Sequence, residues 1–154
     1  MIQRIQTLYL VIADILVALL LFLPVAAVSG KDGKLYNVSL YGILPEGIEA
    51  GAAIQKTWPL LIFACLVMAL LVVIILQYGN RKRQIRLSYV AILLLLGLTA
   101  LIYYYIGAGQ TSLGGVSSIK IFFSFPLIAA VLVFLAIQGI TKDEQLVKSI
   151  DRIR

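Results

Sequence analysis

The most informative part of the chain reads PLLIFACLVMALLVVIILQY and covers Pro59–Tyr78. These 20 residues include no charged side chain. A helix of this length measures about 30 Å, which matches the hydrocarbon core of a bilayer. Because backbone polar groups in lipid must find partners within their own segment, the stretch predicts a transmembrane helix.

Three other runs have 20 or 21 residues and the same character. Leu87–Ile106 and Ile121–Ile140 carry no charge, and Leu8–Val28 carries only Asp14. The four runs predict an all-α membrane protein, a four-transmembrane-helix bundle that forms a single membrane domain over residues 1–154. Leu8–Val28 is longer than the apolar region of a signal peptide, about 7–15 residues, and it contains an aspartate, so we expect it to stay in the protein.

The composition supports lipid as the solvent of the chain. Hydrophobic residues make up 62% of it and charged residues 13%, which is about half of the charged share of a soluble domain. The chain has no histidine and one cysteine, Cys65, which excludes an internal disulfide and the usual zinc and haem sites. It also shows no glycine loop for a nucleotide and no nucleophile beside a base. We therefore expect no enzyme, no cofactor and no metal, and we interpret Cys65 as a small buried hydrophobic residue.

Basic residues are distributed unevenly among the predicted loops. Nine lie on the side that holds the N-terminus, the loop between the second and third runs, and the tail; four lie on the other side. The positive-inside rule therefore predicts that both termini are cytoplasmic. This topology and attraction to anionic lipid explain the net charge of +6, so we expect no nucleic-acid partner. The nine are Arg4, Arg81, Lys82, Arg83, Arg86, Lys142, Lys148, Arg152 and Arg154, and the four are Lys31, Lys34, Lys56 and Lys120.

The first outer loop, residues 29–57, is long enough to fold. Lys31–Lys34 has the residues of a tight turn and Leu35–Tyr41 is rich in strand formers, which predicts a small β-hairpin on the outer face. We expect Ile48–Gln55 to form a short helix and Thr57 to cap the second transmembrane helix.

The second outer loop, residues 107–118, is rich in glycine and serine. Two interpretations remain open for it: a flexible connector, or one strand added to the predicted hairpin. In the run that follows, Pro126 removes a backbone hydrogen bond and leaves the carbonyl of Phe122 without its usual donor. This position predicts a kink in the fourth helix.

The tail, residues 141–154, has the pattern of an amphipathic cytoplasmic helix. Thr141 and Glu144 fit a capping box, and apolar residues then recur on one helical face. Two interpretations remain open: the helix lies on the inner membrane surface, or its apolar face docks on a partner or on the loops of the chain itself. The candidate partner or lipid surface consists of Arg81, Lys82, Arg83, Arg86, Leu146, Ile150, Arg152 and Arg154.

Asp14 is the one charged residue inside a predicted span. An aspartate near the middle of a transmembrane helix costs about 2.5–3.5 kcal/mol on insertion scales. A function or a set of hydrogen bonds must offset this cost. It either marks a proton or ion path or accepts hydrogen bonds from polar groups at the same depth, among them Arg86. The candidate intramembrane polar site consists of Asp14, Gln77, Ser88, Tyr89 and Gln138.

The two ends of the chain resemble a known family. Met1–Leu10, the segment Leu21–Pro24 and the finish Lys142–Arg154 are similar to a family of small Bacteroidota membrane proteins, domain of unknown function 4293. The resemblance implies a bacterial inner membrane and four spans. It implies no activity and no catalytic residue, so none is transferred to this chain.

These observations predict a non-enzymatic accessory or structural subunit of a membrane complex. Its expected partners are the lipid bilayer and other membrane-protein subunits or a second copy of the chain. A second hypothesis is a small oligomeric transporter or channel that uses Asp14 and the Pro126 kink. A third, a membrane enzyme that acts on lipid, would need more polar groups at one depth than the chain offers.

Overall fold

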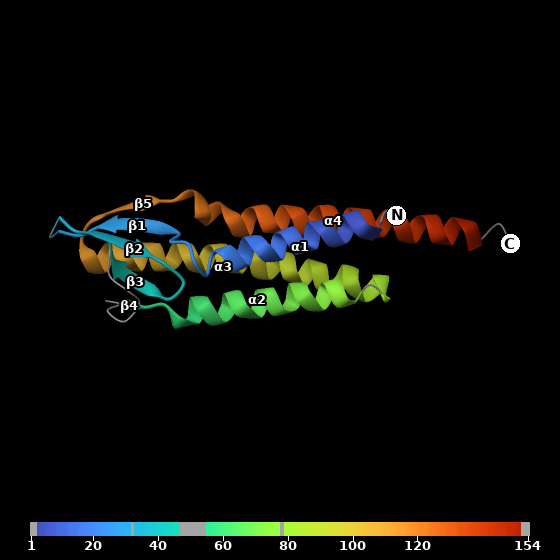
Figure 1. Cartoon of the computed structure of the whole chain (residues 1–154), viewed down its shortest axis with the longest axis horizontal. Coiled ribbons are helices and arrows are strands. Elements are labelled where there is room, and N and C mark those ends of the chain that lie inside the picture. Colours follow the sequence, from blue (N-terminus) through green and yellow to red (C-terminus); the bar gives the residue numbers. More distant parts are fainter. Residues whose placement is uncertain (1–2, 32, 47–54, 78, 152–154) are drawn as a thin grey trace.

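The computed structural model describes residues 3–31, 33–46, 55–77 and 79–151. Within them the helices lie side by side as an elongated bundle with a sheet at one end (Figure 1). We call this the sheet end, and the opposite end, where α1 begins and α2 meets α3, the basic end. The elements are α1 (Gln3–Leu19), β1 (Ala26–Ser29), β2 (Leu35–Val38), β3 (Gly42–Pro45), β4 (Gln55–Lys56), α2 (Trp58–Leu76), α3 (Arg81–Leu113), β5 (Val116–Ile119), the 3₁₀ helix η2 (Ile121–Ser124) and α4 (Phe125–Asp151).

In the described residues, three helical segments are long and apolar enough to cross a membrane: Trp58–Leu76, Arg81–Leu113 and Ile121–Lys142. Ile5–Leu19 is a shorter apolar helix. Large apolar side chains are exposed on the outside of all four helices, for example Leu93 and Val131. A soluble protein would not expose so continuous an apolar surface, so the chain is a multi-pass membrane protein.

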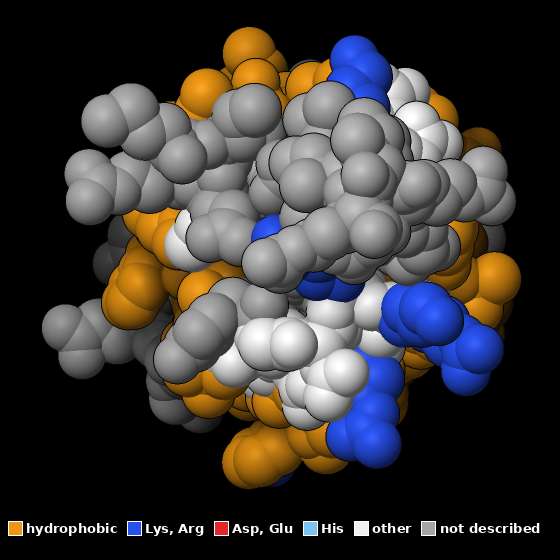
Figure 2. Space-filling model, turned by 90° about the vertical axis from the view of Figure 1, so that its right-hand side faces the viewer, with side chains coloured by type: hydrophobic (Ala, Val, Ile, Leu, Met, Phe, Trp, Pro, Cys, Tyr) orange, Lys and Arg blue, Asp and Glu red, His pale blue; other side chains and the backbone are white. Residues whose placement is uncertain are grey.

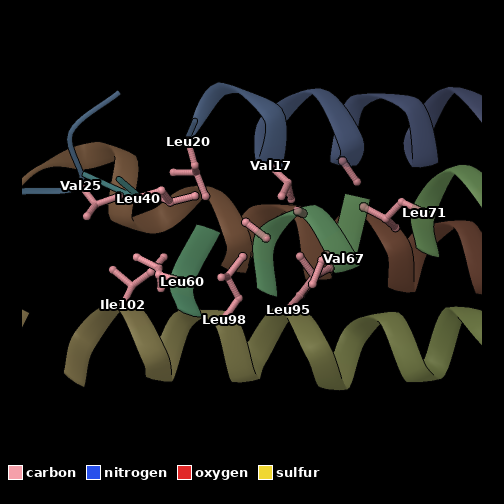
Figure 3. Close-up of a cluster of buried hydrophobic side chains, with 14 of the residues drawn as sticks. Val17, Leu20, Val25, Leu40, Leu60, Val67, Leu71, Leu95, Leu98 and Ile102 are labelled. Carbon is pink, nitrogen blue, oxygen red and sulfur yellow. The ribbon is translucent and has the colours of Figure 1, made fainter. Parts of the chain in front are cut away.

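The centre of the bundle is filled by apolar side chains. α1 contacts α2 and α4, and α3 contacts the same two helices, so the four surround one axis. Val17, Leu71, Leu95 and Leu98 are fully buried and point toward this axis from three helices (Figure 3). In the described part of the chain, side chains packed in this way fill the axis at the level of these residues.

The first predicted span, Leu8–Val28, is wrong at both ends. α1 runs from Gln3 to Leu19, and its last turn tightens, because the amide of Leu20 bonds the carbonyl of Val17 at 3.1 Å. Pro24 cannot donate a backbone hydrogen bond and disfavours helical backbone in the residue before it. The chain then pairs in the sheet, as the 2.8 Å bond from the amide of Val25 to the carbonyl of Val38 shows.

The second span is close to the prediction, and the third is longer. α2 covers Trp58–Leu76 where Pro59–Tyr78 was predicted. α3 has 33 residues and measures about 50 Å, whereas the prediction covered only Leu87–Ile106. The basic residues that were predicted to form a loop therefore lie in the first turns of a helix.

The predicted kink at Pro126 is wrong. α4 begins at Phe125, so Pro126 lies in its first turn, where the missing N–H has no helical partner to lose. The carbonyl of Phe122 accepts a bond from the amide of Phe125 in the preceding 3₁₀ turn. The carbonyl that was expected to lack a donor is thus satisfied.

The tail is helical, as predicted, but it is not a separate helix. α4 continues without a break through Thr141 to Asp151. The predicted capping box is wrong, because the Thr141 hydroxyl donates to the carbonyl of Ile137 at 2.8 Å inside the helix. The side chains of Leu146 and Ile150, and residues Arg152 and Arg154, lie outside the part of the structure that is described.

The predicted hairpin is part of a larger sheet. β1 and β2 form it, joined through the turn at Gly33, whose φ is 71°. The five strands lie in the order β4-β3-β2-β1-β5 and are antiparallel. β5 confirms the second interpretation of residues 107–118, an added strand. The predicted short helix over 48–55 falls outside the described residues except for Gln55, which lies in β4.

One face of the sheet packs on the C-terminal part of α3. Val28 and Ile43 are buried on this face, and a side chain at Gly109 would meet the Cδ1 atom of Ile43 at 2.7 Å. The missing side chain at Gly109 therefore lets the sheet approach the helix closely. This contact explains why α3 continues two turns beyond the predicted span.

Thr57 joins the sheet to α2. It occupies the predicted N-cap position, but its hydroxyl makes no capping bond. Instead the hydroxyl is buried and lies 3.1 Å from the carbonyl of Ser39 and 2.9 Å from that of Leu40, in the β2–β3 turn. The start of α2 is thereby held against the sheet.

The chain between α3 and β5 depends on Gly115. A Cβ atom there would lie 1.4 Å from the carbonyl oxygen of Ser29 in β1. We expect Gly115→Ala to force β5 away from β1 and to lower the free energy of unfolding by at least about 1–3 kcal/mol, the usual effect of overpacking. Thermal unfolding of the purified chain in detergent measures the change.

Gly107→Ala is the matched control, because no atom lies within 4 Å of the added methyl group and the residue lies inside α3. Alanine is the better helix former by about 0.5–1 kcal/mol, so this variant should unfold at an equal or higher temperature. Equal destabilisation by the two substitutions would contradict the described pairing of β5 with β1.

Candidate functional site

Asp14 lies in α1 beside the fully buried Ala13. The residue is half-buried, and its Oδ1 atom is buried without a hydrogen-bond partner among the described residues. An unpaired polar atom in apolar surroundings costs about 1–3 kcal/mol. This cost favours a hydrogen-bond donor for the Oδ1 atom from outside the described residues.

The structure does not gather the predicted polar residues around Asp14. Ser88 is buried, and its hydroxyl donates to the carbonyl of Gln84 at 2.8 Å. Gln77 is half-buried just after the end of α2, while Tyr89 and Gln138 are exposed. In the described part of the chain, none of them forms a hydrogen bond with Asp14, and neither does Arg86.

The depth of Asp14 explains this difference. α1 begins at Gln3 instead of Leu8, so Asp14 lies 11 residues, about 16 Å, from the start of the helix. Gln6 lies against Gly139 of α4, so Gln138 is about two helical turns closer to the basic end than Asp14 is. Gln138 and Asp14 are therefore at different depths.

Two buried glutamines were missed by the sequence analysis. Gln84 is 7% exposed, and its Nε2 atom donates to the carbonyl of Ile74 at 3.2 Å, which ties the start of α3 to the last turn of α2. Gln6 is also 7% exposed, and its Nε2 atom has no partner among the described residues. The spacing of Gln6 from Leu10 and Ala13, which places it on the buried stripe of α1, was the available signal.

The basic end carries the other predicted surface. Arg81 is half-buried, and Lys82, Arg83 and Arg86 are exposed in the first turns of α3; Lys142 is exposed on α4. Figure 2 faces this end and shows Lys and Arg side chains around its rim. Cations at a helix N-terminus oppose the helix dipole, so this cluster does not stabilise α3. Its presence there favours a role in orienting the chain in the membrane or in contacting an anionic surface.

Among the described residues, no three His, Cys, Asp or Glu side chains gather as a metal site would require. The prediction that Cys65 is buried is wrong, because it is exposed on the outside of α2. An apolar thiol on a lipid-facing surface agrees with a helix that is hydrophobic on all sides.

The sequence of the whole chain can be compared with those of known proteins and families. No curated protein is significantly similar to it in sequence. One family matches residues 2–153, which agrees with the family resemblance of the two terminal segments. The chain belongs to this family, which is described as a domain of unknown function (DUF4293).

Proposed function

We propose that the chain crosses the bilayer four times. α1 has only 17 residues, about 25 Å, but both of its ends are aligned with those of the apolar part of α4. Gln6 lies against Gly139 near the basic end, and Ala26, shortly after α1, pairs with Ile119, shortly before α4. Since Ile121–Lys142 is long enough to cross a membrane, α1 and the turn that follows it cover the same thickness.

The basic end lies in the cytoplasm in this proposal. Lys82, Arg83, Arg86 and Lys142 are exposed there, which is the distribution that the positive-inside rule associates with the cytoplasmic side. A bacterial inner membrane fits the family resemblance of the terminal segments. The sheet end then faces outward.

We infer that the protein is a non-enzymatic accessory subunit of a membrane complex. One observation carries this inference: α4 projects past the other three helices at the basic end (Figure 1). The projection, Lys142–Asp151, adds nine residues or about 13 Å beyond Lys142. These last turns project beyond the bundle, and most helical stability in proteins comes from packing on another surface. Its sequence, with Leu146 and Ile150 spaced four residues apart, provides an apolar stripe for a partner.

Removal of the projection tests the accessory role. The full chain, purified from native membranes in mild detergent, should carry a stoichiometric partner protein or form a defined homo-oligomer. A variant that ends at Lys142 should lose this partner, because the apolar stripe is gone, yet it should unfold at nearly the same temperature since the bundle core is intact. Size-exclusion chromatography and quantitative mass spectrometry measure the partner.

A variant that lacks only residues 152–154 is the matched control and should keep the partner. If the full chain purifies alone and monomeric, the accessory role is wrong. Retention of the partner by the chain that ends at Lys142 would place the contact elsewhere and contradict the role of the projection.

The unpaired Oδ1 atom of Asp14 favours a second candidate function, transport between copies of the chain. The axis of one copy is filled by residues such as Leu71 and Leu98, so a path would have to run between copies. This function predicts proton or cation flux into reconstituted vesicles that Asp14→Asn reduces to the protein-free background, because the amide cannot carry the negative charge.

Gln77→Leu serves as the control for this measurement, since the structure does not bring Gln77 near Asp14. Its flux should equal that of the unmodified chain. Background flux from the unmodified chain would exclude the transport function.

A further inference from the structure

A cavity of about 360 Å³ lies between the turn that follows α1 and the strands β2 and β3. Leu21, Phe22 and Pro24, in the turn after α1, line one side of it, and Leu44 and Pro45 of β3 line another. The remaining lining residues are polar and come from β2 and the turn after it: Asn37, Ser39 and Tyr41. The cavity therefore combines an apolar trough with a polar wall.

The alternation of side chains along β2 creates the polar wall. Tyr36, Val38 and Leu40 are buried on the bundle side, so Asn37, Ser39 and Tyr41 face the other way. The Ser39 hydroxyl is already used, because it donates to the carbonyl of Gly42 at 2.9 Å. Asn37 and Tyr41 remain as the groups that can contact a bound molecule.

Lys120 adds a positive charge at this wall. Its Nζ atom donates to the Oδ1 atom of Asn37 at 2.8 Å, although the two residues are 83 positions apart. The contact spans β1, and Ala27, the cross-strand neighbour of Asn37, is small enough to let the lysine pass. The bond leaves both N–H groups of the Asn37 amide as donors, directed away from the ammonium.

The Lys120 ammonium has no acidic partner among the described residues. Lys120 is half-buried, and in that part of the chain it forms no ion pair. Partial burial removes water from the ammonium, which costs free energy, and a bound anion offsets that cost. The wall is therefore complementary to a phosphate rather than to a cation.

The cavity lies at the border between the helices and the sheet. Phe22 is 79% exposed, and Ile121, next to Lys120 in sequence, is 76% exposed. Such apolar side chains belong among acyl chains, whereas a lysine at this level extends toward the headgroups. The polar wall thus lies at the level of the lipid headgroups, and the apolar trough lies at the level of the acyl chains.

We propose that this cavity binds one anionic phospholipid of the leaflet on the sheet side. Its phosphate accepts hydrogen bonds from the Lys120 ammonium, the Asn37 amide and the Tyr41 hydroxyl, and an acyl chain lies along Leu21 and Phe22. A free phosphate would leave the apolar trough in contact with water, so a lipid is the better occupant. The proposal goes beyond the accessory role, because it concerns the opposite end of the molecule and needs no partner protein.

Native mass spectrometry of the full chain in an uncharged detergent tests this site. Phosphatidylglycerol should bind one to one and at least about tenfold more tightly than phosphatidylcholine with the same acyl chains, because the choline neutralises the phosphate. Lys120→Gln should reduce this preference about tenfold. Lys34→Gln is the matched control, since Lys34 is exposed in the β1–β2 turn and the substitution changes the net charge equally.

A second variant separates lipid binding from stability. Phe22→Ser removes an exposed side chain and should weaken phosphatidylglycerol binding without lowering the melting temperature of the lipid-free protein. Equal affinity for the two lipids, equal losses in Lys120→Gln and Lys34→Gln, or unchanged binding in Phe22→Ser overturns the proposal. Competition by soluble glycerol phosphate at the concentration of the lipid also overturns it, because the occupant would then be a free anion.

Discussion

The contact between the five-stranded sheet and the C-terminal part of α3 holds the sheet end of the molecule together. Val28 of β1 and Ile43 of β3 approach the helix where Gly109 has no side chain. β1 follows α1, and β5 precedes η2 and α4, so one sheet fixes where both helices lie relative to each other. Thr57 ties α2 to the same sheet. The relative depth of all four helices therefore depends on this contact.

Local signals in the sequence predicted the four apolar helices and the position of the hairpin turn. Apolar runs of bilayer length identify helices without any knowledge of their neighbours. Gly33 adopts the positive φ that the turn signal at Lys31–Lys34 requires. Both features depend on residues close together in the chain, which is why the sequence was sufficient to predict them.

The helix ends depend on distant contacts, and the sequence could not predict them. Residues 107–113 include two glycines and are weak helix formers, yet α3 continues through them because the sheet packs on this segment. An apolar run such as Val25–Val28 is compatible with a helix or a buried strand, and periodicity does not distinguish the two. The pairing of β1 with β2 and β5 decides in favour of a strand.

The same limitation applies to the candidate site. Asp14 was identified from sequence because it is the one charge in an apolar run, but its proposed neighbours assumed that the helix begins at Leu8. The start of α1 at Gln3 changes the depth of Asp14 and separates it from Gln138. Lys120 looked like an ordinary loop residue, and only the pairing of β5 with β1 brings it to Asn37.

In the proposed topology the chain has four spans, and its sheet end and basic end lie on opposite sides of the membrane. Cysteine labelling tests it directly in a chain whose own Cys65 is replaced by alanine. Single cysteines at positions 4, 34 and 142 are exposed to a membrane-impermeant maleimide before and after the membrane is permeabilised. If this topology is right, position 34 is labelled in cells whose outer membrane alone has been made permeable. Positions 4 and 142 are then labelled only after the inner membrane is permeabilised as well. Labelling of positions 4 and 34 from the same side would show that α1 does not cross the membrane and would contradict the four-span topology.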